Sequence, residues 1–137
     1  MKYVIKAMFP DPLPQIINPD AQKTMYGGKT VAAGATIYLF ADRQSERAGL
    51  VALGSVVKAS AVPKIADVER QTPRVDITIR IETLSRDELG REQLHVFDDW
   101  KDGRPQTELN FKLYRQATSK IVGISDDASI YLDGFFH

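Results

Sequence analysis

The sequence predicts an α+β fold in which five to six mostly antiparallel strands curl into a small barrel, with two or three short helices between them. The clearest evidence is the segment Arg74–Thr83, where Val and Ile occupy every second position and polar residues fill the others. A period of two is typical of a strand with one buried face and one solvated face, as in an antiparallel sheet. Other short segments rich in β-branched and aromatic residues lie between glycines and prolines, and only brief stretches carry helix-capping signals.

The N-terminal part begins with a predicted strand at Tyr3–Phe9. Three prolines between positions 10 and 14 close this strand, because proline has no amide to donate to a strand ladder. An irregular loop is expected over 11–18. A short helix is then predicted over 19–25, with Asn18 as its N-cap and Pro19 at its first position.

Glycines separate the next predicted elements. Tyr26-Gly27-Gly28-Lys29 is interpreted as a turn or an exposed loop, because paired glycines permit positive φ and a close backbone approach. A strand at Ala35–Ala41 follows, and then a charged loop from Asp42 to Ala48. The next strand, Gly49–Ala59, contains Gly54, which indicates a bulge or sharp bend of the kind that barrel closure requires.

Helix-capping patterns dominate the C-terminal half. Ser85-Arg86-Asp87-Glu88 fits a capping box and predicts a short helix. The polar, turn-rich segment from His95 to Asn110 is expected to be an exposed loop. Short strands are predicted over 111–114 and 120–123. Ser125-Asp126-Asp127 then predicts a cap for a final helix that runs through Leu132.

Length and composition are typical of one globular domain over residues 1–137. Hydrophobic residues make up 43% and charged residues 26%, and the absence of cysteine excludes disulfides and thiolate sites. The N-terminal apolar run is interrupted by lysine and no stretch approaches the ~20 apolar residues of a membrane span, so we expect a cytoplasmic protein with no membrane partner. Basic and acidic residues both number 18. Any nucleic-acid contact must therefore be local, and neutrality weakly favours a homodimer.

Catalytic and metal-binding patterns are weak. The two histidines, His95 and His137, have no accompanying nucleophile elbow, and the scattered carboxylates lack the spacing of metal sites. The acidic run near Asp99 lacks the residue order of a calcium loop. The string Gly27-Gly28-Lys29-Thr30 has Lys23 where a phosphate-binding loop requires glycine. We therefore expect no metal, no cofactor and no catalytic residue.

Several aromatic residues fall near predicted strand ends, where pockets form in barrels. Tyr26 lies beside two glycines, Phe40 ends a strand, and Trp100 lies in a polar loop. Aromatic faces at such positions are suited to sandwiching a flat base, although Phe40 is equally compatible with a place in the core. Lys112 and Arg115 belong to the best basic cluster, which fits either phosphate contacts or a solvated face.

The order of these motifs resembles the EVE family of the PUA-like superfamily, whose relatives include ASCH and YTH domains. The resemblance covers nearly the whole chain in order. It implies a PUA-like pseudobarrel with a pocket for a modified base in DNA or RNA, and no cofactor. The segments that carry it are Met1–Lys6, Gly34–Asp42, Gly49–Val57, Arg74–Thr83 and Leu113–Gln116.

Three positions depart from the family pattern. Tyr26 stands near the place of the family's Trp-x-Gly-x-Arg segment, Met8 begins the counterpart of a Ser-Glu-Pro-like string, and Asp42 ends the counterpart of Tyr-His-Ser. The resulting prediction is a non-catalytic module for DNA or RNA that contains a modified base. Its predicted base-binding residues are Tyr26, Phe40, Asp42, Trp100 and Met8, and its predicted phosphate contacts are Lys29, Lys112 and Arg115.

Two other functions stay open. The ASCH relatives include a small amidohydrolase that acts on an acylated nucleoside, and such an enzyme would need a nucleophile or base from Lys6, Lys29 or Tyr26. A dimeric protein-interaction module would use Trp100 and the pair Phe135-Phe136 as contacts. The two phenylalanines are equally suited to closing the core.

Overall fold

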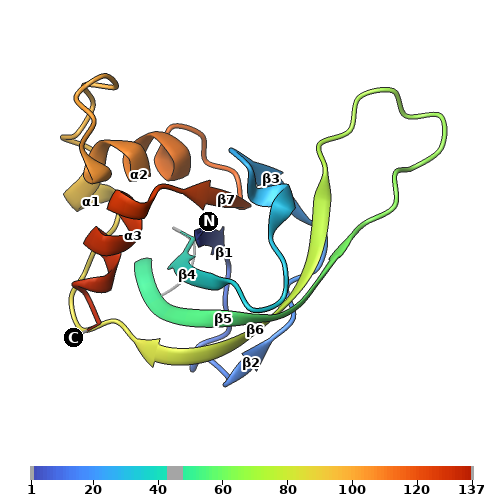
Figure 1. The fold of residues 1–137 in the computed structure, drawn as a ribbon, viewed down its shortest axis with the longest axis horizontal. Coiled ribbons are helices and arrows are strands. Elements are labelled where there is room, and N and C mark those ends of the chain that lie inside the picture. Colours follow the sequence, from blue (N-terminus) through green and yellow to red (C-terminus); the bar gives the residue numbers. More distant parts are fainter. Residues whose placement is uncertain (1, 43–47, 137) are drawn as a thin grey trace.

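The computed structural model describes residues 2–42 and 48–136, and within them a seven-stranded mixed sheet closes into a ring (Figure 1). The strands follow the order β2-β6-β3-β7-β1-β4-β5, and a further pairing between β5 and β6 completes the ring. β1 pairs in parallel with β4 and β3 with β7, while the other pairings are antiparallel. The predicted barrel of mostly antiparallel strands is confirmed, with more strands than the expected five to six. The strands are β1 Lys2–Ala7, β2 Ile16–Ile17, β3 Gln22–Met25, β4 Thr36–Ala41, β5 Gly49–Ala61, β6 Arg74–Leu84 and β7 Lys120–Ile124.

The helices gather on one outer side of the ring, away from the long loop that joins β5 to β6 (Figure 1). They are α1 Arg91–Leu94, α2 Pro105–Tyr114 and α3 Asp126–Asp133, whereas the 3-10 turn η1 Gly28–Thr30 lies beside β3 and β7. The alternation of β1 divides the core in two: Ile5 packs inside the ring, whereas Val4 packs under the helices with Leu109 and Leu132. In the described part of the chain, no helix has the length and apolar character needed to cross a membrane.

Gly54 lies where β5 changes register against β6, so the bend predicted at this glycine is confirmed. A Cβ at this position would lie 2.7 Å from the backbone oxygen of Arg80 and 2.7 Å from a methyl carbon of Ile79. Only glycine therefore allows the close approach that completes the ring.

The helix predicted over 19–25 is wrong, since residues 22–25 form β3. The φ of Ala21 is +49°, which no α-helix accommodates. Two β6 side chains hold this bend, because Asp76 accepts a hydrogen bond from the Ala21 amide and Arg74 donates one to the Ala21 carbonyl. Thr24 then donates both its amide and its hydroxyl to the Pro73 carbonyl. Long-range pairing has overridden the local Asn18-Pro19 signal.

The helix predicted to begin at Ser85 is also wrong. The Ser85 hydroxyl donates to the carbonyl of Leu50 at 2.9 Å and so ties the end of β6 to β5 instead of capping a helix. Helix α1 begins later, at Arg91, and the Gln93 side chain accepts a hydrogen bond from the amide of Gly90. The capping function lies five residues further along the chain than the sequence pattern suggests.

The loop predicted over 95–110 is confirmed over 95–104, but residues 105–110 and the strand predicted over 111–114 form helix α2. Pro105 occupies its first turn, and Leu109 and Leu113, one turn apart, are fully buried. The strand predicted over 120–123 and the final helix are confirmed as β7 and α3, with the Ser125 hydroxyl accepting from the Ala128 amide. Most of the charged loop predicted from Asp42 to Ala48 lies outside the described residues.

Candidate functional site

A cavity of about 390 Å³ opens where β1 and β4 end, and we call it the rim cavity. The parallel pairing of these two strands places Ala7 opposite Ala41, and the Asp42 amide continues the pairing by donating to the Ala7 carbonyl at 2.7 Å. The C-terminal ends of both strands therefore deliver side chains to the same wall. The lining includes Lys6, Ala41, Asp42, Gly49, Arg91 and Tyr114.

The charged wall of the rim cavity is built from Lys6 and Asp42. The Lys6 side chain is only 4% exposed, and its Nζ lies 4.0 Å from Oδ2 of Asp42, which also accepts a hydrogen bond from the Ser119 hydroxyl. Burial lowers the pKa of the Lys6 amine, the Asp42 carboxylate partly restores it, and Arg91 lowers it further. The cavity thus holds an amine and a carboxylate with little access to bulk water.

Tyr114, at the end of α2, forms the aromatic wall. Its ring packs edge-on against Phe40 with centroids 6.5 Å apart, and Nζ of Lys6 lies 5.8 Å from its centroid. Burial and the nearby Asp42 raise the pKa of the phenol, so the hydroxyl stays protonated and can donate. Among the described residues, nothing hydrogen-bonds with this buried hydroxyl. A buried polar group without a partner is unfavourable, and a ligand in the cavity would relieve that cost.

A second feature is a cluster of exposed rings around Phe111 on α2, which we call the aromatic patch: Tyr26, Trp100 and Phe111 with Arg115. The rings of Tyr26 and Trp100 pack edge-on against Phe111, with centroids 5.8 and 5.4 Å away. The guanidinium of Arg115 lies 4.4 Å from the Phe111 centroid. Tyr26 and Trp100 remain 39% and 45% exposed, and a hollow of about 280 Å³ runs along Trp100 and Phe111.

The Tyr26-Gly27-Gly28 turn presents Tyr26 to this patch, and the predicted turn is confirmed. Tyr26 and Gly27 have φ of +52° and +86°. Gly28 approaches β7 so closely that a Cβ there would lie 2.1 Å from the Ile121 carbonyl oxygen. A tyrosine is uncommon and strained in the left-handed region, and this conformation directs the Tyr26 ring towards Phe111.

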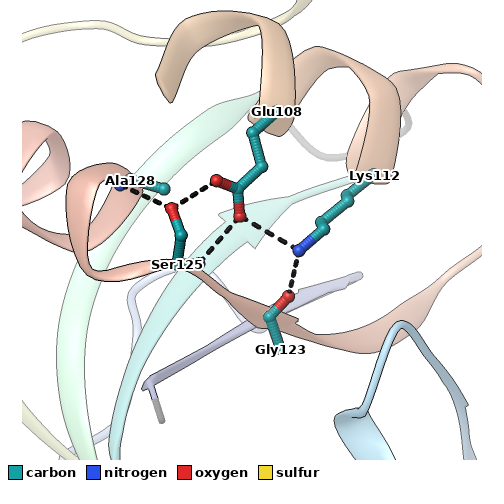
Figure 2. Close-up of polar contacts among 5 residues, drawn as sticks. All are labelled: Glu108, Lys112, Gly123, Ser125 and Ala128. Atoms are coloured by element: carbon teal, nitrogen blue, oxygen red, sulfur yellow. Dashed lines mark hydrogen bonds and ion pairs between the residues drawn. The ribbon is translucent and has the colours of Figure 1, made fainter. Parts of the chain in front are cut away.

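Glu108 joins α2 to the start of α3, as Figure 2 shows. Its carboxylate accepts hydrogen bonds from the amide and hydroxyl of Ser125, at the start of α3, and from Lys112 at 3.0 Å. Lys112 also donates to the Gly123 carbonyl at 2.7 Å, and its Nζ lies 5.8 Å from the Tyr26 centroid. Lys112 therefore serves first to join α2 to β7.

Comparison with solved structures identifies the fold of the chain. No protein-family model and no curated protein sequence matches the chain. The DUF55 domain of human thymocyte nuclear protein 1 is similar in structure over 96% of both chains, with a TM-score of 0.66 and 9% identity. Human THYN1 in complex with DNA containing 5-methylcytosine is similar over 96% of this chain and 94% of that one, with a TM-score of 0.65 and 10% identity. A protein from Pseudomonas putida is similar over 98% of this chain and 99% of that one, with a TM-score of 0.63 and 10% identity.

The chain has the THYN1 fold. The predicted fold class, an α+β pseudobarrel of mostly antiparallel strands with short helices, is thereby confirmed. Within this fold the rim cavity lies where β1 and β4 end, and α2 contributes residues both to the cavity and to the aromatic patch.

The structure divides the predicted site residues into separate places. Asp42 lines the rim cavity, whereas Tyr26, Trp100, Lys112 and Arg115 meet at the aromatic patch. Met8 is 61% exposed and lines a different groove, of about 550 Å³, beside Pro10 and Ile16. Lys29 is exposed on η1.

Phe40 differs most from its expected role. It has no exposed surface and packs within the core under the helices, so it offers no face to a ligand. Its contribution is to support the ring of Tyr114. Tyr114 itself was missed, because residues 111–114 are predicted as a strand. The sequence does contain a signal for this helix, because Leu109 and Leu113 are four residues apart, as apolar residues on one face of a helix are.

Proposed function

We propose that this chain is a non-catalytic nucleic-acid-binding module that takes a modified base into the rim cavity. The observation that carries the proposal is the buried Tyr114 hydroxyl, which has no partner in the described residues and lines a cavity of about 390 Å³. That volume suits a small planar ligand. The choice of nucleic acid is supported by the shared fold with a THYN1 structure that contains 5-methylcytosine DNA. The proposal includes membership of the EVE family.

The donors and acceptors of the cavity suit a base edge that has both an amino group and a ring acceptor. A carboxylate such as Asp42 accepts from the exocyclic amine of cytosine or adenine. The protonated Tyr114 hydroxyl donates to a ring nitrogen or carbonyl. Nζ of Lys6 lies 4.0 Å from Oδ2 of Asp42 and is its ion-pair partner. These groups favour an amino-bearing base, and a small added group such as a methyl is proposed from the THYN1 structure that contains 5-methylcytosine DNA.

The remaining predicted residues are proposed to hold the strand outside the cavity. Tyr26 and Trp100 are placed to contact neighbouring nucleotides, and Arg115 projects beside them. Lys29 and Met8 are exposed and are proposed as outer contacts. Lys112 can contact phosphate only if it breaks one of the hydrogen bonds that it donates to Glu108 and to the Gly123 carbonyl.

Substitution of Tyr114 by phenylalanine tests this proposal. Tyr114→Phe removes only the hydroxyl, so the packing against Phe40 is kept. We expect the affinity for an oligonucleotide with one 5-methylcytosine to fall about tenfold, the value of one buried hydrogen bond, and the affinity for the unmodified counterpart to fall equally, because the two bases share the acceptor. Fluorescence anisotropy with labelled oligonucleotides measures both affinities.

Tyr131→Phe is the matched control, because Tyr131 is a partly buried tyrosine on α3 that packs against Phe135. It should leave both affinities unchanged. An unchanged affinity in Tyr114→Phe would mean that the base is not read in the rim cavity.

One observation favours a second candidate, an amidohydrolase for acylated nucleosides. Lys6 lies in a cavity beside a carboxylate, and burial lowers the pKa of its amine, as nucleophilic and general-base lysines require. Incubating the purified protein with an N4-acylated cytidine and following release of the acid by chromatography decides between the two. Release that disappears in Lys6→Met supports the enzyme, and binding without release supports the module.

The dimeric interaction module has less support. Phe136 is 6% exposed and belongs to the core under the helices, and Phe135 packs on Tyr131. These two residues therefore close the core. A homodimer stays a prediction, and sedimentation at several concentrations measures it.

A further inference from the structure

The rim cavity and the aromatic patch are linked by one turn of α2. Tyr114 lines the cavity and Phe111 is the centre of the patch. Three residues correspond to ~4.5 Å along a helix axis. Successive nucleotides of one strand are separated by ~3.4 Å or more. The cavity and the patch are therefore close enough along α2 for neighbouring nucleotides of one strand to contact both.

The patch is preorganised for stacking. Trp100 and Tyr26 are each fixed by an edge-on contact with the same ring, with interplanar angles of 73° and 60°. Both stay substantially exposed in spite of these contacts. Little rotamer entropy is lost when such a ring binds a planar ligand, because the protein already holds it.

The charges at the patch favour an anionic ligand. Among the described residues that line the hollow beside Trp100, Glu108 is the one acidic side chain, and its oxygens are taken by Ser125 and Lys112. Arg104 lines the same hollow with a side chain 65% exposed and with its Nε 4.0 Å from Oδ2 of Asp102, and Arg115 lies over Phe111. Exposed rings between two guanidinium groups match a base and its flanking phosphates better than they match an apolar peptide.

We propose that the aromatic patch is a second subsite, where Trp100 stacks the unpaired nucleobase next to the one held in the rim cavity. This inference rests on the proposed function for its nucleic-acid ligand. It adds a preference for the polymer: the chain binds a modified base in a single strand more tightly than the same base within an uninterrupted duplex.

Trp100 is the sole tryptophan of the chain, so intrinsic fluorescence reports directly on this subsite. Titration with an unmodified single-stranded hexanucleotide is expected to quench the emission, and the duplex of the same sequence to quench it much less. Trp100→Ala is expected to weaken single-strand binding about tenfold by anisotropy, with Trp100→Phe restoring most of it. Ile130→Ala, at an exposed apolar position on α3, should change nothing.

The two proposals fail separately in these assays. If Tyr114→Phe weakens binding of the 5-methylcytosine oligonucleotide and Trp100 emission does not respond to any strand, the patch subsite is refuted and the proposed function stands. If single strands quench Trp100 without any preference for a modified base, the proposed function is refuted and the subsite stands. Equal affinity of wild type and Trp100→Ala for the hexanucleotide would also refute the subsite.

Discussion

Lys6 and Lys120 are the residues at which burial and charge conflict most directly. They face each other across β1 and β7 and are 4% and 1% exposed. Lys6 has Asp42 as its counterion, whereas Lys120 donates to the carbonyl of Gln116 at 3.1 Å. Burial, together with the neighbouring Lys6, lowers the pKa of Lys120 to about 8. The folded state therefore disfavours the charged form of Lys120.

Replacing Lys120 by methionine should stabilise the protein in a pH-dependent way. Below pH 8 the amine is charged in both states, so the whole cost of burying it is present. Between about 8 and 10.5 the folded state releases its proton first, and wild type gains stability as the pH rises. We expect Lys120→Met to be more stable by about 1–3 kcal/mol at pH 7, and this gain to shrink towards pH 10. Urea unfolding across this range measures it, with the exposed Lys58→Met as control. A gain in stability that does not vary with pH would contradict the lowered pKa of Lys120 as its cause.

At the scale of elements, the Glu108 network determines how α2 sits on β7 and α3 (Figure 2). Burial alone would raise the pKa of Glu108, but the hydrogen bonds from Ser125 and Lys112 outweigh it and leave the pKa below its usual range. The charged carboxylate is thus the form that the folded protein prefers. Because both Tyr114 and Phe111 are on α2, this network also positions the two proposed subsites.

Glu108→Gln should weaken this junction only where the carboxylate is charged. A lowered pKa contributes stability above the unfolded value of 4.5, and that contribution is lost as the pH falls through the folded pKa. We expect wild type to exceed the variant by about 1–2 kcal/mol at pH 7 and the two to converge below about pH 4. Chemical unfolding at both pH values tests this, with Glu92→Gln on the exposed face of α1 as control. A difference that persists at low pH would mean that charge is not responsible.

For the whole molecule, closure of the ring depends on the β5–β6 pairing, which passes through Gly54. This glycine pairs with Ile37 of β4 on one side and with Ile81 of β6 on the other. A side chain there meets backbone on β6 instead of a flexible side-chain end. The ring cannot relax at this point without separating two strands.

Gly54→Ala is expected to destabilise the protein by about 2–4 kcal/mol, through overpacking against the Arg80 carbonyl and the Ile79 methyl. Gly90→Ala is the matched control, since its Cβ would meet nothing closer than 3.4 Å. Thermal unfolding of both variants measures the difference. Similar melting temperatures would show that the bulge adapts.

What the sequence by itself determined is local. The alternation of β6, the cap of α3 at Ser125 and the turn at Gly27-Gly28 were all predictable, because each depends on residues close together in the chain. Tyr26, Asp42 and Trp100 were identified as candidates for the same kind of reason, as aromatic or polar residues beside predicted turns.

Only the tertiary structure decided the rest. Gln22–Met25 is a strand because β6 and β7 offer it hydrogen bonds, and α2 is a helix because Leu109 and Leu113 find a core to fill. The same packing buries Phe40 and places Tyr114 in the cavity, so which ring lines the cavity was decided by contacts between residues more than 70 positions apart. Long-range pairing and burial depend on partners that no local pattern specifies, and they outweigh local propensities of a few tenths of a kcal/mol per residue.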